Sequence, residues 1–295
     1  MGASRQSFPL TPKQKSMANV RSLVRRSYRL SMLPRDWLIR QALAWVEAPE
    51  ARRFASVLEL LERRDAREQT GAIAAIEQER RRLASNTDLL ADGSLGEAGI
   101  YDAKMSIADA CKASKPASPA LLMHLLVREF APKQLVELGT NLGISSAYEA
   151  TALRANGFGA LATFESSPYR LRVAKQVHTG LDLNNISYFQ GLFSETLAVA
   201  LKDLPPVDFA FIDGHHQYQP TLDYCELMLR HAAPELIVVF DDIRWSDGMK
   251  RAWRVLKKDA RFQFVVDLHG VGICMRVPRT VARRYVFPAL HHTFS

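Results

Sequence analysis

Two glycines and one carboxylate in this chain are spaced as in a binding site for a nucleotide-like ligand. Gly139 and Gly143 lie between a β-type apolar run at 134–138 and a helical pattern at 144–156. At such a junction, backbone N–H groups and the positive end of the helix dipole can bind the polar part of a ligand. Glu165 follows Gly143 by 22 positions, where a carboxylate can accept hydrogen bonds from both hydroxyl groups of a ribose. We therefore expect a nucleotide-like ligand here.

The spacing of the glycines narrows the class of ligand. Gly-x-x-x-Gly differs from the Gly-x-Gly-x-x-Gly turn of NAD and FAD proteins, and no third glycine follows three residues after Gly143. The turn also lacks the Lys-Ser/Thr ending of a P-loop. The sequence therefore disfavours an NAD-linked oxidoreductase. For Glu165, the alternative is an acid in a surface turn.

Alternating strands and helices after Pro132 would hold these residues in place. The strand candidates are near-continuous apolar runs, which are typical of a parallel sheet covered by helices on both faces. A last helix at 247–259 precedes two strands that are joined across His269-Gly270 as a hairpin. The expected fold is α/β, with a doubly wound, mostly parallel Rossmann-like seven-stranded sheet that ends in an antiparallel hairpin and follows a helical N-terminal region. The predicted strands cover 134–138, 160–164, 186–190, 207–212, 235–240, 261–268 and 271–277, and the helices between them cover 144–156, 168–180, 194–203 and 219–231.

In a doubly wound sheet, the ligand binds at the carboxyl ends of the strands. Each of the first five predicted strands is followed by polar residues or glycine. These segments are 137–145, Glu165, 191–193, 213–216 and 241–242. The functional site is expected where they meet.

Taken in this order, the segments resemble the class I S-adenosylmethionine-dependent methyltransferases. Within that class they are similar to the O-methyltransferase branch, which includes catechol and caffeoyl-CoA methyltransferases and metal-dependent sugar methyltransferases. The resemblance covers about residues 105–277. It is carried by Val-Glu-Leu-Gly-Thr-Asn-Leu-Gly-Ile-Ser at 136–145, Phe-Glu at 164–165, Asp-Phe-Ala-Phe-Ile-Asp-Gly-His-His-Gln-Tyr at 208–218 and Val-Phe-Asp-Asp-Ile-Arg-Trp at 239–245.

The resemblance implies S-adenosyl-L-methionine as the cofactor. Ser145, at the start of the predicted helix, would meet the carboxylate of the cofactor, as the helix dipole also predicts. Glu165 would hold the ribose, and residues 191–193 would flank the adenine. The cofactor-binding residues that the resemblance implies are Glu137, Gly139, Gly143, Ser145, Glu165, Gly191, Phe193 and Asp213.

The resemblance also implies catalytic roles for Asp213 and His216. His216 stands where relatives carry a catalytic Lys or His, and a neutral imidazole near pH 7 is suited to removing a hydroxyl proton. Asp213, Asp241 and Asp242 match the positions that bind a divalent ion, typically Mg²⁺, in metal-dependent relatives. Three converging carboxylates would repel one another unless a hard cation neutralised them. Alternatively, Asp241 and Asp242 could cap a turn, Asp213 could bind only the cofactor, and His216 could have a structural role.

Positive charge is concentrated near the N-terminus. Residues 1–46 contain nine Lys or Arg and one acid, a net charge of +8, which equals the net charge of all 295 residues. The remainder is therefore neutral in sum and gives no indication of a nucleic-acid surface. We expect a basic flexible head at 1–34, a helical region with a candidate lid at 35–105, the S-adenosylmethionine-binding domain at 106–280 and a C-terminal tail at 281–295.

Other features exclude several classes of protein. Cys111, Cys225 and Cys274 are far apart and include no Cys-x-x-Cys, which argues against a disulfide framework or zinc cluster and fits a reducing compartment. No apolar run approaches the ~18 residues that a membrane span needs. We expect a cytoplasmic protein, or an organellar one if residues 1–34 are a transit peptide. The N-terminal helices could form a homodimer.

The leading hypothesis is a methyltransferase acting on a hydroxyl group of a small molecule, with Mg²⁺ assistance left open. Tyr218, Trp245 and Trp253 could line the acceptor pocket or pack in the core. One alternative is a nucleic-acid or protein methyltransferase that uses the basic head as a tether. The fourth strand, however, ends in Ile-Asp-Gly-His rather than in the Asn/Asp-Pro-Pro-Tyr/Phe of amino-group methyltransferases. Another alternative is a non-catalytic regulator that binds S-adenosylmethionine.

Overall fold

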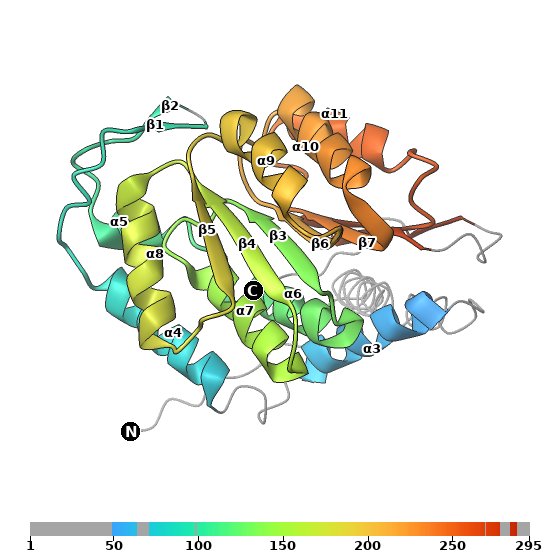
Figure 1. Cartoon of the computed structure of the whole chain (residues 1–295), viewed down its shortest axis with the longest axis horizontal. Coiled ribbons are helices and arrows are strands. Elements are labelled where there is room, and N and C mark those ends of the chain that lie inside the picture. Colours follow the sequence, from blue (N-terminus) through green and yellow to red (C-terminus); the bar gives the residue numbers. More distant parts are fainter. Residues whose placement is uncertain (1–48, 64–70, 98, 269, 278–283, 288–295) are drawn as a thin grey trace, which may run out of the picture.

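A central sheet of eight strands organises the computed structural model (Figure 1), which describes residues 49–63, 71–97, 99–268, 270–277 and 284–287. The strand order is β10-β8-β9-β7-β6-β3-β4-β5. Strands β3 to β7 pair in parallel, β9 is antiparallel to β7 and β8, and β10 is parallel to β8. The strands are β3 (Gln134–Leu138), β4 (Ala160–Glu165), β5 (Ile186–Gln190), β6 (Val207–Ile212), β7 (Ala232–Phe240), β8 (Phe264–Leu268), β9 (Val271–Arg276) and β10 (Tyr285–Phe287).

The expected fold class is confirmed, and one strand is added to it. The predicted strands 134–138, 186–190 and 207–212 have the observed bounds, because each is a short run of β-forming residues bounded by turn residues. Strand β10 was not predicted and lies in the stretch expected to be a tail. It pairs with β8, and the ring of Tyr285 stacks on that of Phe264 at 5.3 Å between centroids.

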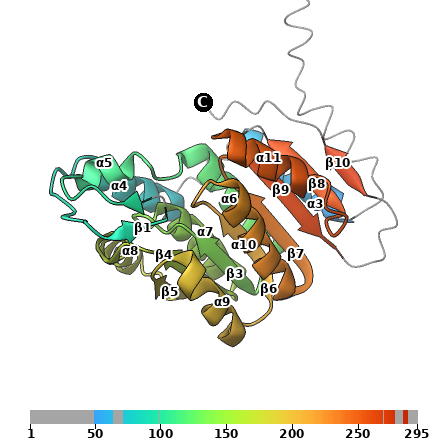
Figure 2. The same ribbon diagram turned by 90° about the horizontal axis from the view of Figure 1, so that it is seen from above.

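Helices cover both faces of the sheet (Figures 1 and 2), as the continuous apolar strands predict. One face packs against helices that precede or follow β3 and β4, and the other packs against α9, α10 and α11. The first group is α3 (Pro49–Arg63), α4 (Ala72–Ala84), α5 (Ile107–Cys111), α6 (Ala117–Phe130), α7 (Ile144–Asn156) and α8 (Pro168–Gly180), and the second is α9 (Phe193–Asp203), α10 (Tyr218–Arg230) and α11 (Asp247–Leu256).

Helices α3 and α4 share a hydrophobic core with the sheet. Phe54 and Leu58 of α3 are buried against α6, and Ile76 of α4 is buried in the same cluster as residues of α7. The apolar faces of α3 and α4 are thus covered within the chain, and a homodimer through the N-terminal helices stays a prediction. The predicted helix that starts near Trp37, and the basic head at 1–34, lie outside the described residues. None of the described helices is long and apolar enough to cross a membrane.

The carboxyl ends of the five parallel strands β3 to β7 lie side by side, and this row of strand ends is the edge of the sheet at which the site lies. The chain winds outward from β3 through β4 to β5 and then returns to the other side of β3 for β6 and β7. This reversal marks the position at which doubly wound sheets bind ligands. In the order of the strands, Asp241, Asp213, Gly139, Glu165 and Gly191 stand at or directly after these ends. Five of the predicted site residues therefore share this edge.

Candidate active site at the carboxyl ends of the strands

The two glycines of the turn after β3 are required for different packing reasons. Gly139 has φ 108°, and a Cβ there would lie 2.1 Å from the backbone oxygen of Asp213. Gly143 has φ 86°, and a Cβ there would lie 2.8 Å from Nε2 of His178 and 2.9 Å from Ala174, both on α8. Gly143 therefore makes room for α8, and its role in binding the cofactor stays a prediction. Gly139 lets the end of β6 approach the turn.

Glu137 is fully buried behind the turn. Its Oε2 accepts a hydrogen bond from Thr163 Oγ1 at 2.6 Å, and its Oε1 has no hydrogen-bond partner among the described residues. Burial raises the pKa of Glu137 to about 7, against the hydrogen bonds that lower it. Ser145, at the start of α7, is also buried, and its contact with the carboxylate of the cofactor stays a prediction.

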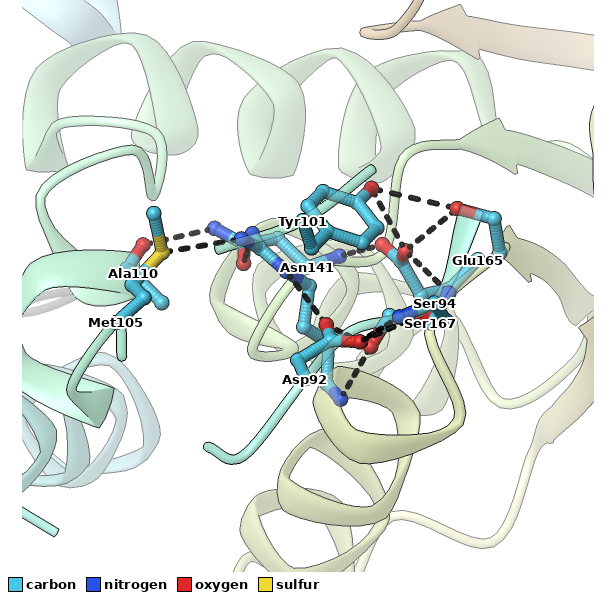
Figure 3. A network of polar contacts seen from close by, with 10 residues as sticks. Asp92, Ser94, Tyr101, Met105, Ala110, Asn141, Glu165 and Ser167 are labelled. Atoms are coloured by element: carbon cyan, nitrogen blue, oxygen red, sulfur yellow. Dashed lines mark hydrogen bonds and ion pairs between the residues drawn. The ribbon is translucent and has the colours of Figure 1, made fainter. Parts of the chain in front are cut away.

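Glu165 ends β4 as a buried, oriented carboxylate (Figure 3). Its Oε2 accepts the backbone N–H of Asn141 at 2.8 Å, and its Oε1 accepts that of Ser167 at 3.0 Å. The hydroxyl of Tyr101 lies 3.4 Å from Oε1. A surface turn acid would be exposed, whereas this side chain is held in one orientation by two separate loops. That arrangement supports a ligand-binding role for Glu165.

Tyr101 belongs to the segment 85–106, which contains the short hairpin of β1 (Leu95–Gly96) and β2 (Gly99–Ile100). Its ring lies 4.2 Å below the guanidinium of Arg170, and Arg170 donates to Asn141 Oδ1 at 2.8 Å. Asp92 of the same segment accepts a hydrogen bond from Ser167. These contacts fix the candidate lid against the ends of β3 and β4, and Figure 3 shows Tyr101 and Asp92 beside Asn141, Glu165 and Ser167.

Glu97 joins the same segment to the loops after β5 and β6. Its carboxylate accepts the backbone N–H of Phe193, and its Oε2 lies 3.0 Å from Nδ1 of His215 and 3.4 Å from the hydroxyl of Tyr224. The ring of Phe193 is buried, and a Cβ on Gly214 would come within 2.7 Å of it. The first residue of α9 is thus packed directly on the loop that carries Gly214 and His215.

Gly191 begins the loop after β5, with φ 134°. A Cβ at this position would lie 2.7 Å from Cγ2 of Thr196, in the first turn of α9. Glycine therefore allows the chain to turn sharply from β5 into α9. Whether Gly191 and Phe193 flank an adenine stays a prediction.

Asp213 stands between a histidine and a lysine. Its Oδ1 lies 3.7 Å from Nε2 of His216, and its Oδ2 lies 3.5 Å from Nζ of Lys115. Lys115 also forms an ion pair with Asp241, whose side chain is 4% exposed. The backbone of His216 has φ 26°, an uncommon value that the packing of the loop must maintain. The structure therefore places the side chains of His216, Asp213, Lys115 and Asp241 next to one another in that order.

The expected metal site is not assembled. Across the described ranges, no group of three or more His, Cys, Asp and Glu side chains could hold a metal ion. Asp213 and Asp241 are bridged by the ammonium of Lys115, and Asp242 stands in a turn, with φ 50° and its backbone carbonyl accepting the N–H of Trp245. The three aspartates predicted as ligands therefore do not fit Mg²⁺ as placed here, because a cationic side chain already occupies the position between two of them.

A cleft of about 580 Å³ opens beside His216. Tyr218 and Trp245 line it, and the indole of Trp245 is 74% exposed. Trp253 is instead buried, donates its Nε1–H to Asp267 at 2.8 Å and packs on Gly272. Two of the three aromatic residues proposed for an acceptor pocket thus line a cleft beside the predicted base, and the third belongs to the core.

Residues 136–243 match the model of a protein family described as "Methyltransferase domain". The matched stretch begins in β3, ends in the turn after β7 and includes every strand end described above. These residues are a methyltransferase domain. The resemblance to methyltransferases that the sequence predicted is therefore confirmed for residues 136–243, and the chain is an enzyme of the methyltransferase class.

Several solved structures resemble the methyltransferase domain and its flanking elements. The O-methyltransferase of Bacillus cereus in complex with SAH is 20% identical, with a TM-score of 0.48 over 56% of this chain and 83% of that chain. The O-methyltransferase TomG of Streptomyces achromogenes, involved in tomaymycin synthesis and in complex with SAM, is 20% identical, with a TM-score of 0.48 over 56% and 82%. The SAH-bound methyltransferase PaMTH1 of Podospora anserina is 15% identical, with a TM-score of 0.49 over 57% and 81%. No curated protein matches the sequence.

Sequence reasoning missed three residues that the structure places at the edge of the methyltransferase domain. Lys115, Glu97 and Tyr101 all precede β3 and reach strand ends through tertiary contacts. The only local signal was the step from Lys115 to Pro116, because a residue before proline is restricted to an extended conformation. This signal predicts the backbone conformation of Lys115 but does not predict which carboxylates its side chain contacts.

Proposed function

We propose that this protein transfers a methyl group from S-adenosyl-L-methionine to a hydroxyl group of a small molecule. The observation that carries the proposal is the pairing of two features along one edge of a methyltransferase domain. Glu165, buried and oriented by Asn141 and Ser167, stands where a ribose would be held, and His216 faces Asp213 beside a cleft. The O-methyltransferases of Bacillus cereus and Streptomyces achromogenes support the same reading through their named activity.

The cofactor supplies a sulfonium-bound methyl group that is already activated toward a nucleophile. His216 would take the proton of the acceptor hydroxyl, and the acceptor oxygen would form its bond to the methyl carbon as the carbon–sulfur bond breaks. Because Nε2 of His216 faces Asp213, Nδ1 keeps the lone pair that receives this proton. The carboxylate of Asp213 would stabilise the imidazolium that forms. An aligned acceptor about 3 Å from the methyl carbon needs little further assistance.

Tyr218 and Trp245 would hold the acceptor in the cleft beside His216. Their flat rings suit an apolar or aromatic body, and the exposed indole of Trp245 gives the acceptor access from solvent. The segment with Tyr101 and Glu97 would act as the lid over the cofactor end, since both residues contact the strand ends there.

A screen of hydroxylated small molecules with methyl-labelled S-adenosyl-L-methionine tests this proposal. The expected result is transfer of the label to an acceptor oxygen, with release of S-adenosylhomocysteine and loss of transfer in His216→Gln. Transfer of the label only to nitrogen or to a macromolecule would contradict the proposed acceptor class.

A further inference from the structure

Lys115 reaches the active-site edge from the loop between α5 and α6. Pro116, the N-cap of α6, follows it directly and restricts its backbone to an extended conformation. The side chain of Lys115 is only 10% exposed, and its ammonium lies 5.9 Å from the centroid of the Phe211 ring in β6. This is not the setting of an ordinary surface lysine, whose ammonium would remain in water.

The environment of this ammonium is set by two carboxylates from neighbouring strand ends. Lys115 forms an ion pair with Asp241, 126 residues away in the sequence, and its Nζ lies 3.5 Å from Oδ2 of Asp213. The two aspartate side chains are 4% and 16% exposed, so leaving them without a cation would be costly. Lys115 supplies that cation from within the chain.

A divalent ion would compete with Lys115 for the same oxygen atoms. An ion bound by both Asp213 and Asp241 would stand within a few ångströms of Nζ, where two positive charges repel strongly at low dielectric. The ammonium would therefore have to leave before the ion could bind. Nothing else in the arrangement draws it away, because among the described residues its ion pairs are those with Asp213 and Asp241.

We propose that Lys115 is the resident cation of this active site, at the position where the sequence predicted Mg²⁺. The proposal rests on the proposed function and deepens it: methyl transfer proceeds without a divalent metal. Lys115 is a positioning residue for Asp213, whose other oxygen faces His216. Its positive charge also stabilises the negative charge that develops on the acceptor oxygen as the proton moves to His216.

Binding of Mn²⁺, measured by electron paramagnetic resonance with and without S-adenosyl-L-methionine, tests the proposal without any acceptor. The full chain is expected to bind no Mn²⁺ at this edge. Lys115→Ala removes the ammonium and leaves two carboxylates facing each other, so it is expected to gain a Mn²⁺ site, and Lys115→Ala/Asp241→Asn is expected to lose it again. Lys112→Ala is the matched control, because Lys112 pairs with Asp109 on the surface of the same loop.

Two results would overturn the proposal. One is Mn²⁺ binding by the unaltered chain that Asp241→Asn abolishes. The other is a folded Lys115→Ala variant, verified by circular dichroism, that gains no Mn²⁺ site. If Lys115→Ala does not fold, Lys115→Gln keeps most of the side-chain volume and is held to the same two criteria.

Turnover gives a second readout once an acceptor is found. Transfer is expected to persist in EDTA, to fall at least tenfold in kcat in Lys115→Gln and to recover in part in Lys115→Arg. Restoration of transfer by Mg²⁺ after EDTA treatment of the unaltered chain would contradict a resident ammonium. Because Mn²⁺ binding needs no methyl donor, failure of the proposed function and failure of this inference appear in different measurements.

Discussion

The hydroxyl of Tyr101 lies 3.4 Å from Oε1 of Glu165, which places a residue of the candidate lid on the carboxylate proposed to hold a ribose. Burial and the charge of Glu165 raise the pKa of Tyr101 to about 12, so its hydroxyl remains a donor at neutral pH. The same carboxylate oxygen also accepts the backbone N–H of Ser167. A ribose that binds Glu165 must therefore share or replace the contact made by Tyr101.

Tyr101→Phe should tighten the binding of S-adenosyl-L-methionine. The variant keeps the ring under Arg170 and removes only the hydroxyl that competes for Glu165. At 3.4 Å this hydrogen bond to the carboxylate is long, so we expect its loss to favour ligand binding by about 0.5–1 kcal/mol, which corresponds to a two- to fivefold lower Kd. Isothermal titration calorimetry measures the change, with Tyr285→Phe, far away on β10, as the control. Weaker binding would show that Tyr101 instead assists the bound ligand.

His216→Gln should lower kcat by roughly 10²- to 10⁴-fold, the usual contribution of a general base, and leave the affinity for S-adenosyl-L-methionine unchanged. Glutamine keeps much of the size of histidine but cannot accept the proton. His231→Gln serves as the control, because His231 lies at the end of α10, next to the amino end of β7. Steady-state rates with any acceptor found in the screen give the result. Full activity of His216→Gln would assign the base to another group.

Gly139→Ala should destabilise the fold more than Gly157→Ala. Both glycines have positive φ, 108° and 80°, and both substitutions carry the strain of that conformation. Only at Gly139 would the new Cβ meet backbone, 2.1 Å from the oxygen of Asp213, whereas a Cβ at Gly157 has nothing within 4 Å. We expect about 1 kcal/mol for Gly157→Ala and clearly more, on the order of 3 kcal/mol, for Gly139→Ala. Urea unfolding compares them, and equal losses would refute the close approach of β6.

Glu149 makes the stability of the fold dependent on pH. It is fully buried on α7, and neither carboxyl oxygen has a partner in the described part of the chain. Burial, followed by the charges of Glu137 and Asp213, raises its pKa well above 4.5. The folded protein therefore keeps this proton at pH values where the unfolded chain has released it. The contribution of protonated Glu149 to the free energy of unfolding is complete below pH 4.5 and is lost as the pH rises through the raised pKa.

Glu149→Gln should remove that dependence. The variant is expected to be about 1–3 kcal/mol more stable than the unaltered chain at pH 8, and the difference should shrink toward zero near pH 4. Thermal unfolding across this range shows the trend, with the exposed Glu235→Gln as the control. A difference that grows as the pH falls would have the wrong sign and would contradict a buried, protonated Glu149.

The regular part of the fold was predictable because it is local. The strands at 134–138 and 207–212 are apolar runs bounded by turns, and the helix at 168–180 begins with a serine cap and a proline, so local patterns determine them. β10 could not be foreseen, since its three residues gain their order from pairing with β8.

The site was predicted only in part, because local patterns can be read from the sequence and tertiary contacts cannot. Glu165, Asp213 and His216 follow strands, and the order of those strands brings them to one edge. The partners of Asp213 depend instead on how a distant loop folds back, and one sequence contains no sign that Lys115 meets Asp241. The sequence therefore predicted that Asp213 and Asp241 lie close together, but it did not predict that Lys115 stands between them.

Calorimetric titration of S-adenosyl-L-methionine into the full chain, compared with Glu165→Ala, tests the central claim most directly. The charge-assisted hydrogen bonds to a ribose contribute about 1.5–3 kcal/mol each, so the variant should bind at least tenfold more weakly than the unaltered chain. Glu195→Ala, exposed on α9, should bind as the unaltered chain does. Equal affinity in Glu165→Ala, or no binding by the unaltered chain, would contradict an S-adenosylmethionine site at this edge of the sheet.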